Sequence, residues 1–267
     1  MNVTDIDKIR ATFQPRDIVT AFMLLTRLPL PTAPFVPHAG RSLAQAAWAY
    51  PLVGLGVGLI AVLVAWILQS LGVVSPITAL FVVLASVVVS GAMHEDGLAD
   101  CADGFWGGFD MAKRLAIMKD SQIGTYGVIA MVVSLLLRWY VITQMIEKGV
   151  LLGAVLTAAV MSRGAMVWVM HRLPHARREG LAQSTGKPGR AATYAALGLA
   201  ALAALFAPEV STLWLIVIAV LATLGVQTVA RRKIGGQTGD VLGATQQIVE
   251  VAILIAFDTM VYDWHPD

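Results

Sequence analysis

The chain has 267 residues, of which 57% are hydrophobic and only 13% are charged, and its mean hydropathy is +0.74. This composition is too apolar for an ordinary soluble domain of that length, and it predicts an integral membrane protein. The formal charge of +2, without basic runs beside aromatic residues, argues against a nucleic-acid partner. The single cysteine, Cys101, excludes an intramolecular disulfide and a cysteine-based metal site.

The N-terminal segment MNVTDIDKIRATFQPRD mixes both charge signs and lacks the basic, apolar and small-residue regions of a signal peptide. Residues 17–27 (DIVTAFMLLTR) have an amphipathic pattern and precede the proline-rich stretch LPLPTAPFVP. We therefore expect an interfacial helix on the cytoplasmic membrane surface.

Seven later segments have roughly the 20 apolar residues that a helix needs to cross about 30 Å of hydrocarbon. They lie at about 44–69, 73–93, 127–146, 150–170, 191–207, 211–230 and 241–260. The sequence predicts an all-α fold, a polytopic transmembrane bundle of about seven spans forming a single domain over residues 1–267.

The basic residues are distributed unequally between the two sides of these spans. Sixteen of the 19 lysines and arginines fall on one side and only Lys148 on the other, whereas Arg138 and Arg163 lie within spans. Because cytoplasmic loops carry the excess of basic residues, we expect a multi-pass protein of the cell inner membrane. The polar motifs described next would then face the cytoplasm.

The first polar motif, HEDGLADCADG, follows the second predicted span. If the helix of that span continues through it, Asp96, Asp100 and Asp103 share one face, and Glu95 points elsewhere. Neighbouring carboxylates in this stack repel each other by about 3 kcal/mol at about 6 Å and an effective dielectric constant of about 20. With no basic residue at 97–109, we expect Mg²⁺ or Mn²⁺ between them, because these ions prefer oxygen ligands.

A divalent ion held in this way indicates a diphosphate substrate. Glycines within and after the motif let a bulky anion approach the backbone, and Lys113, Arg114 and Lys119 are candidate contacts for phosphate oxygens. The second polar motif, GGQTGDVLGATQQIVE, places Asp240 at the start of the last span, with Gln237 and Thr238 beside it. We predict that this motif also contacts substrate or metal.

Three ionisable residues fall within predicted spans: Arg138, Arg163 and Glu250. Each costs about 2.5–3.5 kcal/mol at the bilayer centre and therefore needs a partner. Helical rise places Arg138 and Glu250 at similar depths, so the sequence indicates an internal ion pair. His171 and His175 are four residues apart, but Pro174 breaks the helix that a zinc pair would need.

In sequence the chain resembles the cobalamin synthase (adenosylcobinamide-GDP ribazoletransferase) family. The resemblance covers most of the chain and rests on FMLLTRLPLP, YPLVG, HEDGLADCADG, RLAIMKDSQIGTYG and GGQTGDVLGATQQIVE, in that order. Gln247 stands where relatives often carry Glu, whereas Glu250 is retained.

The resemblance implies an integral membrane enzyme that requires Mg²⁺. Such an enzyme joins adenosylcobinamide-GDP to α-ribazole, or to its 5′-phosphate, and releases GMP. Asp96, Asp100 and Asp103 would bind Mg²⁺, and Asp103 or Asp240 would accept the hydroxyl proton. The remaining substrate contacts would come from Lys113, Arg114, Lys119, Asp120, Ser121, Gln237 and Thr238.

Two other kinds of protein compete with this interpretation. Other membrane diphosphate transferases, of the CDP-alcohol phosphotransferase or prenyltransferase type, need further acidic motifs that this chain lacks. A transporter would use the charged residues within the spans as its path, but that hypothesis does not explain the aspartates of the first motif. The expected partners are therefore the corrinoid and ribazole substrates and membrane lipid.

Overall fold

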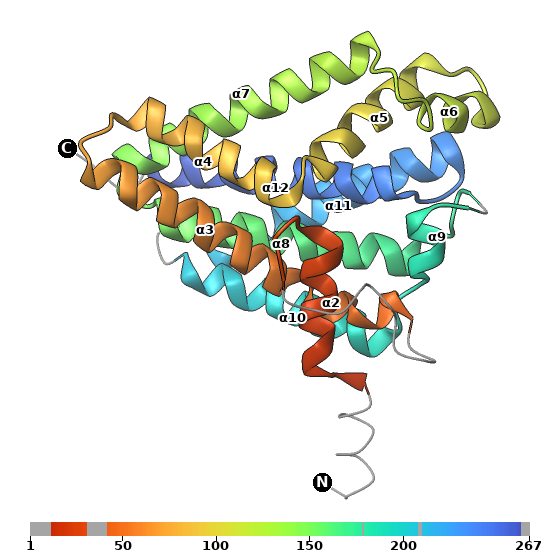
Figure 1. Ribbon diagram of the computed structural model, residues 1–267, viewed down its shortest axis with the longest axis horizontal. Coiled ribbons are helices and arrows are strands. Elements are labelled where there is room, and N and C mark those ends of the chain that lie inside the picture. Colours follow the sequence, from red (N-terminus) through yellow and green to blue (C-terminus); the bar gives the residue numbers. More distant parts are fainter. Residues whose placement is uncertain (1–11, 31–41, 178, 208–209, 263–267) are drawn as a thin grey trace, which may run out of the picture.

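The computed structural model describes residues 12–30, 42–177, 179–207 and 210–262 (Figure 1). Within these residues the protein is helical, apart from loops and one isolated parallel bridge between His175 and Gln237. The elements are α2 (Pro15–Leu25), η1 (Leu43–Ala49), α3 (Tyr50–Ser70), α4 (Ser75–Ser90), α5 (Met93–Gly107), α6 (Met111–Ile117), α7 (Thr125–Glu147), α8 (Leu151–Arg172), α9 (Leu181–Thr185), α10 (Arg190–Ala203), η2 (Ala204–Phe206), α11 (Thr212–Ile234) and α12 (Gly239–Tyr262). This architecture confirms the predicted all-α class.

Five helical segments of the described chain are long and apolar enough to cross a membrane: η1 with α3, then α7, α8, α11 and α12. The pair α4 and α5 makes a sixth candidate, with a bend of 87° between its two helices. The segment predicted as a span at 191–207 forms α10, an apolar helix of only 14 residues, followed by η2. Each predicted hydrophobic segment is thus helical, but α4 and α10 are shorter than predicted.

The bend after α4 has a local backbone cause. Gly91 has φ +66° and Ala92 has φ +56°, and two consecutive left-handed residues cannot belong to a right-handed helix. The second span therefore ends at Ser90, and the first polar motif begins a new helix at Met93. The helix of the second span therefore does not continue straight through residues 94–103, although these residues do share one helix, the polar helix α5.

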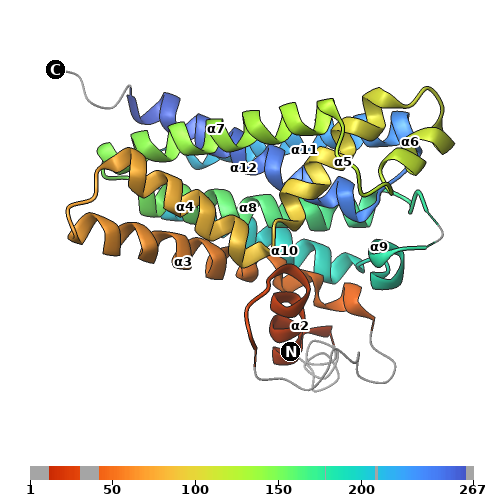
Figure 2. The same cartoon turned by 45° about the horizontal axis from the view of Figure 1, so that its top comes forward.

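The bundle is built around α8. Its apolar window is 83% buried, compared with 28% for α11, and it packs against α3, α10 and α12. Small residues allow this packing: a Cβ on Gly164 of α8 would lie 2.6 Å from the Cβ of Ala200 on α10. In Figures 1 and 2, α5, α6 and α9 gather at one end of the bundle, opposite the end where α12 finishes.

Charged side chains differ between these two ends. The last turns of α8 and α11 carry basic residues, and α11 ends beside α5 and α6, where Lys233 Nζ donates to the Phe105 carbonyl at 2.9 Å. At the opposite end, Lys148 pairs with Asp258 at 2.7 Å. The N-terminal helix α2, predicted at 17–27, lies across the bundle near the α4–α5 bend, where Arg27 N donates to the Val89 carbonyl at 2.8 Å.

Candidate active site

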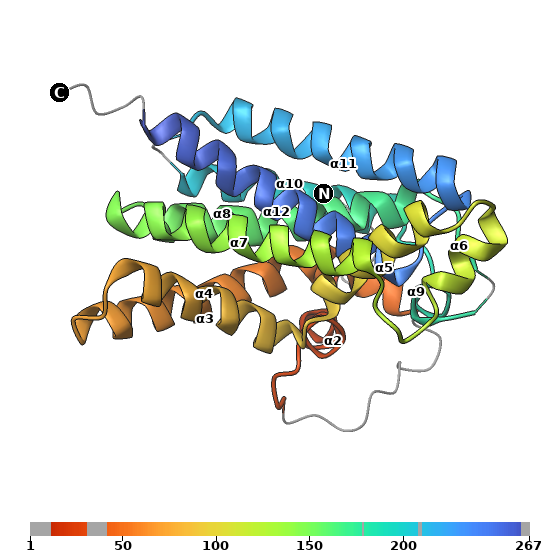
Figure 3. The ribbon, with the colours of Figure 1, turned by 90° about the horizontal axis from the view of Figure 1, so that it is seen from above.

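The polar helix α5 crosses the start of α12 at very short range. A Cβ on Gly97 would lie 2.7 Å from the carbonyl oxygen of Asp240, so only glycine fits at this crossing. The same crossing brings the exposed Asp96 and the half-buried Asp100 toward Asp240. The two polar motifs, far apart in sequence, therefore meet at the end of the bundle that holds α5, α6 and α9 (Figure 3).

A pocket of about 180 Å³ lies at this meeting point. Its polar lining comes from α5, the loop between α8 and α9, α9 itself, and the loop that leads into α12 with the first residues of that helix. The lining includes Asp96, His175, Arg177, Gln237, Thr238 and Asp240. Of the predicted site residues, Asp96, Asp240, Gln237 and Thr238 are brought together here, which joins the first and second polar motifs in one cavity.

Carboxylates crowd this region of the protein. Burial and the nearby charges of Asp240, Asp96 and Asp103 together raise the pKa of Asp100 to about 7, and the charge of Arg177 opposes part of this rise. This shift agrees with the repulsion expected from the sequence. The carboxylates therefore provide strongly negative surroundings that favour a bound cation.

Arg177 is the cation that the structure adds to this set. Its Nη1 lies 3.5 Å from Asp240 Oδ2, and its Nη2 donates to the Leu115 carbonyl at 3.0 Å. In the sequence, Arg177 is only one of the sixteen basic residues that predict the orientation in the membrane. Nothing in the local pattern connects it with Asp240, which lies 63 positions later. The expectation that no basic residue lies near the aspartates holds only for neighbours in sequence.

Backbone pairing fixes the loop that carries Arg177. Ala176 N donates to the Gln237 carbonyl at 2.9 Å, and Gln237 N donates to the Pro174 carbonyl at 2.8 Å. The Gln237 side-chain amide lies 3.0 Å from His175 Nδ1. Burial and the charge of Lys187 lower the pKa of His175, which favours the neutral form of its ring.

Asp103 has a different environment from the other aspartates of α5. Its carboxylate is buried and accepts hydrogen bonds from Gly124 N at 2.7 Å and Gly127 N at 2.9 Å. A Cβ on Gly124 would lie 2.5 Å from Asp103 Oδ1, which explains the glycine there. Asp103 therefore connects α5 to the first turn of α7, and it does not line the pocket.

Arg114 is held by backbone carbonyls. It donates to the carbonyls of Gly108 at 3.0 Å, Phe109 at 3.1 Å and Lys233 at 3.0 Å. Its guanidinium thus ties α6 to the end of α11, and it does not line the pocket.

The other predicted phosphate contacts on and after α6 lie on the surface. Lys113, Lys119, Asp120 and Ser121 are exposed, and none lines the 180 Å³ pocket. Asp120 Oδ1 accepts from Gln122 N at 3.2 Å, which stabilises its own turn. The structure thus leaves these four side chains outside the site where the two polar motifs meet.

Among the described residues, no group of three or more His, Cys, Asp or Glu side chains is arranged as a ready metal site. Mg²⁺ does not need such a cage, because it is usually bound by one or two carboxylates together with substrate phosphates and water. Asp96 lines the pocket, and Asp100 is electrostatically coupled to Asp96 and Asp240. This donor set, all oxygen and net negative, fits Mg²⁺ bound together with a phosphorylated substrate.

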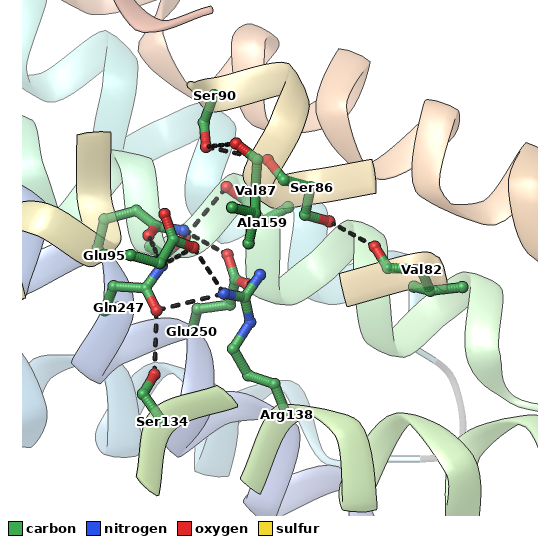
Figure 4. A network of polar contacts seen from close by, with 12 residues as sticks. Val82, Ser86, Val87, Ser90, Glu95, Ser134, Arg138, Ala159, Gln247 and Glu250 are labelled. Carbon is green, nitrogen blue, oxygen red and sulfur yellow. Dashed lines mark hydrogen bonds and ion pairs between the residues drawn. The ribbon is translucent and has the colours of Figure 1, made fainter. Parts of the chain in front are cut away.

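A second polar cluster lies deeper in the bundle, between α5, α7 and α12 (Figure 4). Arg138 of α7 pairs with Glu250 at 3.1 Å, which confirms the predicted ion pair, and also with Glu95 at 2.8 Å. Gln247 bridges them, donating to Glu95 at 3.0 Å and accepting from Arg138 at 3.3 Å. Glu95 does point away from the aspartate face, and its target is Arg138.

Arg163, the other charged residue within a span, borders the same cluster. Its Nη1 donates to the Ala159 carbonyl at 3.0 Å. A cavity of about 20 Å³ separates it from the glutamates and has room for roughly one water molecule. Arg138, Glu95 and Glu250 thus pair with one another, whereas Arg163 Nε is buried without a hydrogen-bond partner in the described part of the chain.

Taken together, the fold and site define a class: a polytopic, all-α membrane protein with an acidic, oxygen-rich pocket at one end of its helical bundle. A family model described as cobalamin-5-phosphate synthase matches residues 17–257. The chain belongs to this family.

Curated relatives agree with this assignment. An adenosylcobinamide-GDP ribazoletransferase of Sinorhizobium medicae is 42% identical over 89% of this chain and 94% of its own length. A protein of the same name from Rhizobium meliloti is 43% identical over the same shares, and one from Bradyrhizobium diazoefficiens is 38% identical over 93% of this chain and 95% of its own. No solved structure matches the chain.

Proposed function

We propose that this protein is an adenosylcobinamide-GDP ribazoletransferase that closes the nucleotide loop in cobalamin biosynthesis. The family match and the names of the curated relatives support this activity. The observation that carries the proposal is the pocket where Asp96 of the first polar motif faces Asp240 of the second. Both motifs belong to the sequence pattern of the family, and the fold unites them.

The reaction is a phosphoryl-group substitution. The hydroxyl oxygen of α-ribazole, or of its 5′-phosphate, forms a new bond to the phosphorus that stays with cobinamide. The bond from that phosphorus to the bridging oxygen breaks, GMP leaves with the electron pair, and the hydroxyl proton passes to a base. The products are adenosylcobalamin, or its 5′-phosphate, and GMP. Catalysis of this kind depends mainly on positioning and charge neutralisation.

Residue roles follow from the pocket. Asp96 and Asp100 would hold Mg²⁺, which would neutralise charge on the diphosphate. Asp240 lines the pocket and Asp103 does not, so we assign the proton-accepting role to Asp240. Thr238 Oγ1 donates to Asp240 Oδ2 at 3.1 Å and orients that carboxylate. Asp103 supports the site by holding α7 against α5.

We also propose that the protein is a multi-pass protein of the cell inner membrane with the pocket facing the cytoplasm. The excess of basic residues at the pocket end of the bundle supports this orientation. The apolar helices provide the contacts with membrane lipid.

The activity can be tested with the purified full-length protein in detergent. Adenosylcobinamide-GDP, α-ribazole and Mg²⁺ should give one GMP for each cobalamin formed, and EDTA should stop both. A protein that binds these substrates and releases no GMP would contradict the assignment. Removal of Mg²⁺ without loss of rate would contradict only the metal assignment.

A further inference from the structure

We infer that Arg177 binds a phosphoryl oxygen of the GDP-bearing substrate and is the main phosphate-binding cation of the pocket. This inference rests on the proposed function. It adds to the proposed site a residue that the sequence pattern uses only to predict the orientation in the membrane. It assigns Arg177 the role predicted for Lys113, Arg114 and Lys119, none of which lines the pocket.

Arg177 is held in place before any ligand arrives. Its loop is paired with the backbone of Gln237 on both sides of His175. Its side chain is about three-quarters buried, and Nη2 is fixed by the Leu115 carbonyl. A guanidinium prepared in this way loses little conformational entropy on binding phosphate.

Its hydrogen-bonding capacity is not used up. The Nε donor is buried and has no hydrogen-bond partner within the described part of the chain. Nη1 faces Asp240 at 3.5 Å, which is an ion-pair distance but longer than a charge-assisted hydrogen bond. Nη1 is therefore the donor that is available to a phosphoryl oxygen in the pocket.

Charge also points to this role. A diphosphate diester carries one negative charge on each phosphoryl group, and it must enter a pocket lined by Asp96, Glu179 and Asp240. Mg²⁺ offsets part of this repulsion. Arg177 lines the same pocket, and its positive charge acts on Asp100 in the opposite sense to the neighbouring carboxylates. It is therefore in position to offset the repulsion that Mg²⁺ leaves.

The test is ligand binding without turnover. Equilibrium dialysis of the full-length protein with adenosylcobinamide-GDP and Mg²⁺, in the absence of ribazole, gives a Kd for the wild type, Arg177→Gln and Arg177→Lys. The loss of a charge-assisted contact predicts roughly 10- to 100-fold weaker binding for Arg177→Gln, with Arg177→Lys intermediate. Adenosylcobinamide, which has no diphosphate, should bind all three proteins equally.

Arg172→Gln is the matched control. Arg172 lies five residues earlier, is exposed, and has its guanidinium 5.4 Å from the Trp168 ring centroid, outside the pocket. It should keep the wild-type Kd. If Arg177→Gln does not fold, Arg177→Lys decides the question, since its charge is retained and only the paired donors are lost.

The outcomes separate this inference from the proposed function. If the wild type turns over and Arg177→Gln keeps the wild-type Kd, Arg177 does not bind phosphate, whether or not kcat falls. Equal weakening toward adenosylcobinamide would also overturn the inference, because the effect would not involve the diphosphate. If the wild type neither binds adenosylcobinamide-GDP nor releases GMP, it is the proposed function that fails.

Discussion

At the scale of single residues, Asp100 makes the site sensitive to pH. Its pKa of about 7 means that the carboxyl retains its proton below that pH and is ionised above it. Mg²⁺ at the proposed site would bind the ionised form, so its affinity should rise up to tenfold per pH unit as pH increases toward 7 and level off above it. Mn²⁺ binding followed by electron paramagnetic resonance from pH 5.5 to 8.5 measures this.

Asp100→Asn is the companion variant for the pH experiment. It should bind Mn²⁺ more weakly and with a smaller dependence on pH. A wild-type curve with the same slope as that of Asp100→Asn would mean that another group controls the metal site.

Asp103 makes a second prediction at this scale, because it holds two backbone N–H groups at the start of α7. Asp103→Ala leaves both donors without their partner and should lower stability by roughly 1–2 kcal/mol. Asp103→Asn keeps an acceptor and should lose less. Thermal unfolding in detergent measures this, with Asp96→Ala as a control of unchanged stability. Equal melting temperatures for Asp103→Ala and wild type would contradict the structural role.

Sequence reasoning reached part of this site. The acidic motifs identified Asp96 and Asp240, since their residue types and glycine neighbours indicate metal and phosphate chemistry. Arg177 and the cap made by Asp103 were missed because both depend on contacts between distant segments. A basic residue before a predicted span has the same local pattern whether it faces lipid headgroups or a pocket.

At the scale of helices, Arg138 holds α5 in place. It joins Glu95 of α5 to Glu250 of α12, and all three side chains are buried. Arg138→Leu leaves two buried carboxylates without their cation and should cost about 3–5 kcal/mol. Because α5 carries Asp96 and Asp100, the variant should also need more Mg²⁺ for activity. Thermal unfolding and Mg²⁺ titration measure the two effects.

Moving the negative charge from residue 95 to residue 247 provides a control for the role of Arg138. Gln247 contacts both Arg138 and Glu95, so a carboxylate at 247 would lie beside the same guanidinium. Glu95→Gln and Gln247→Glu should each destabilise the protein, whereas the double variant should recover most of the loss. Additive losses would show that charge balance at Arg138 does not stabilise α5.

The sequence indicated the pair of Arg138 with Glu250 because helical rise gives the depth of residues in straight spans. It did not indicate Glu95, because the bend at Gly91 and Ala92 turns α5 by 87° and sends that side chain into the bundle. Hydrophobic patterns report which residues are apolar and do not report a turn of the backbone. For the same reason, α4 and α10 were predicted too long.

At the scale of the whole molecule, the proposed orientation can be tested by cysteine labelling. Cys101 is buried, so a Cys101→Ala background carries single cysteines at Lys148 or Arg232, which lie toward opposite ends of the bundle. In intact spheroplasts, an impermeant thiol reagent should label the cysteine at 148, and it should label the one at 232 only after lysis. The reverse pattern would place the pocket on the outer side.

The central claim is that the two polar motifs form one Mg²⁺-dependent transferase site. GMP release from adenosylcobinamide-GDP and α-ribazole, measured for the wild type, Asp100→Ala and the exposed control Arg172→Gln, tests it most directly. We predict release in the wild type and control, and loss of at least a hundredfold in Asp100→Ala at equal membrane insertion. Full activity in Asp100→Ala would contradict the account.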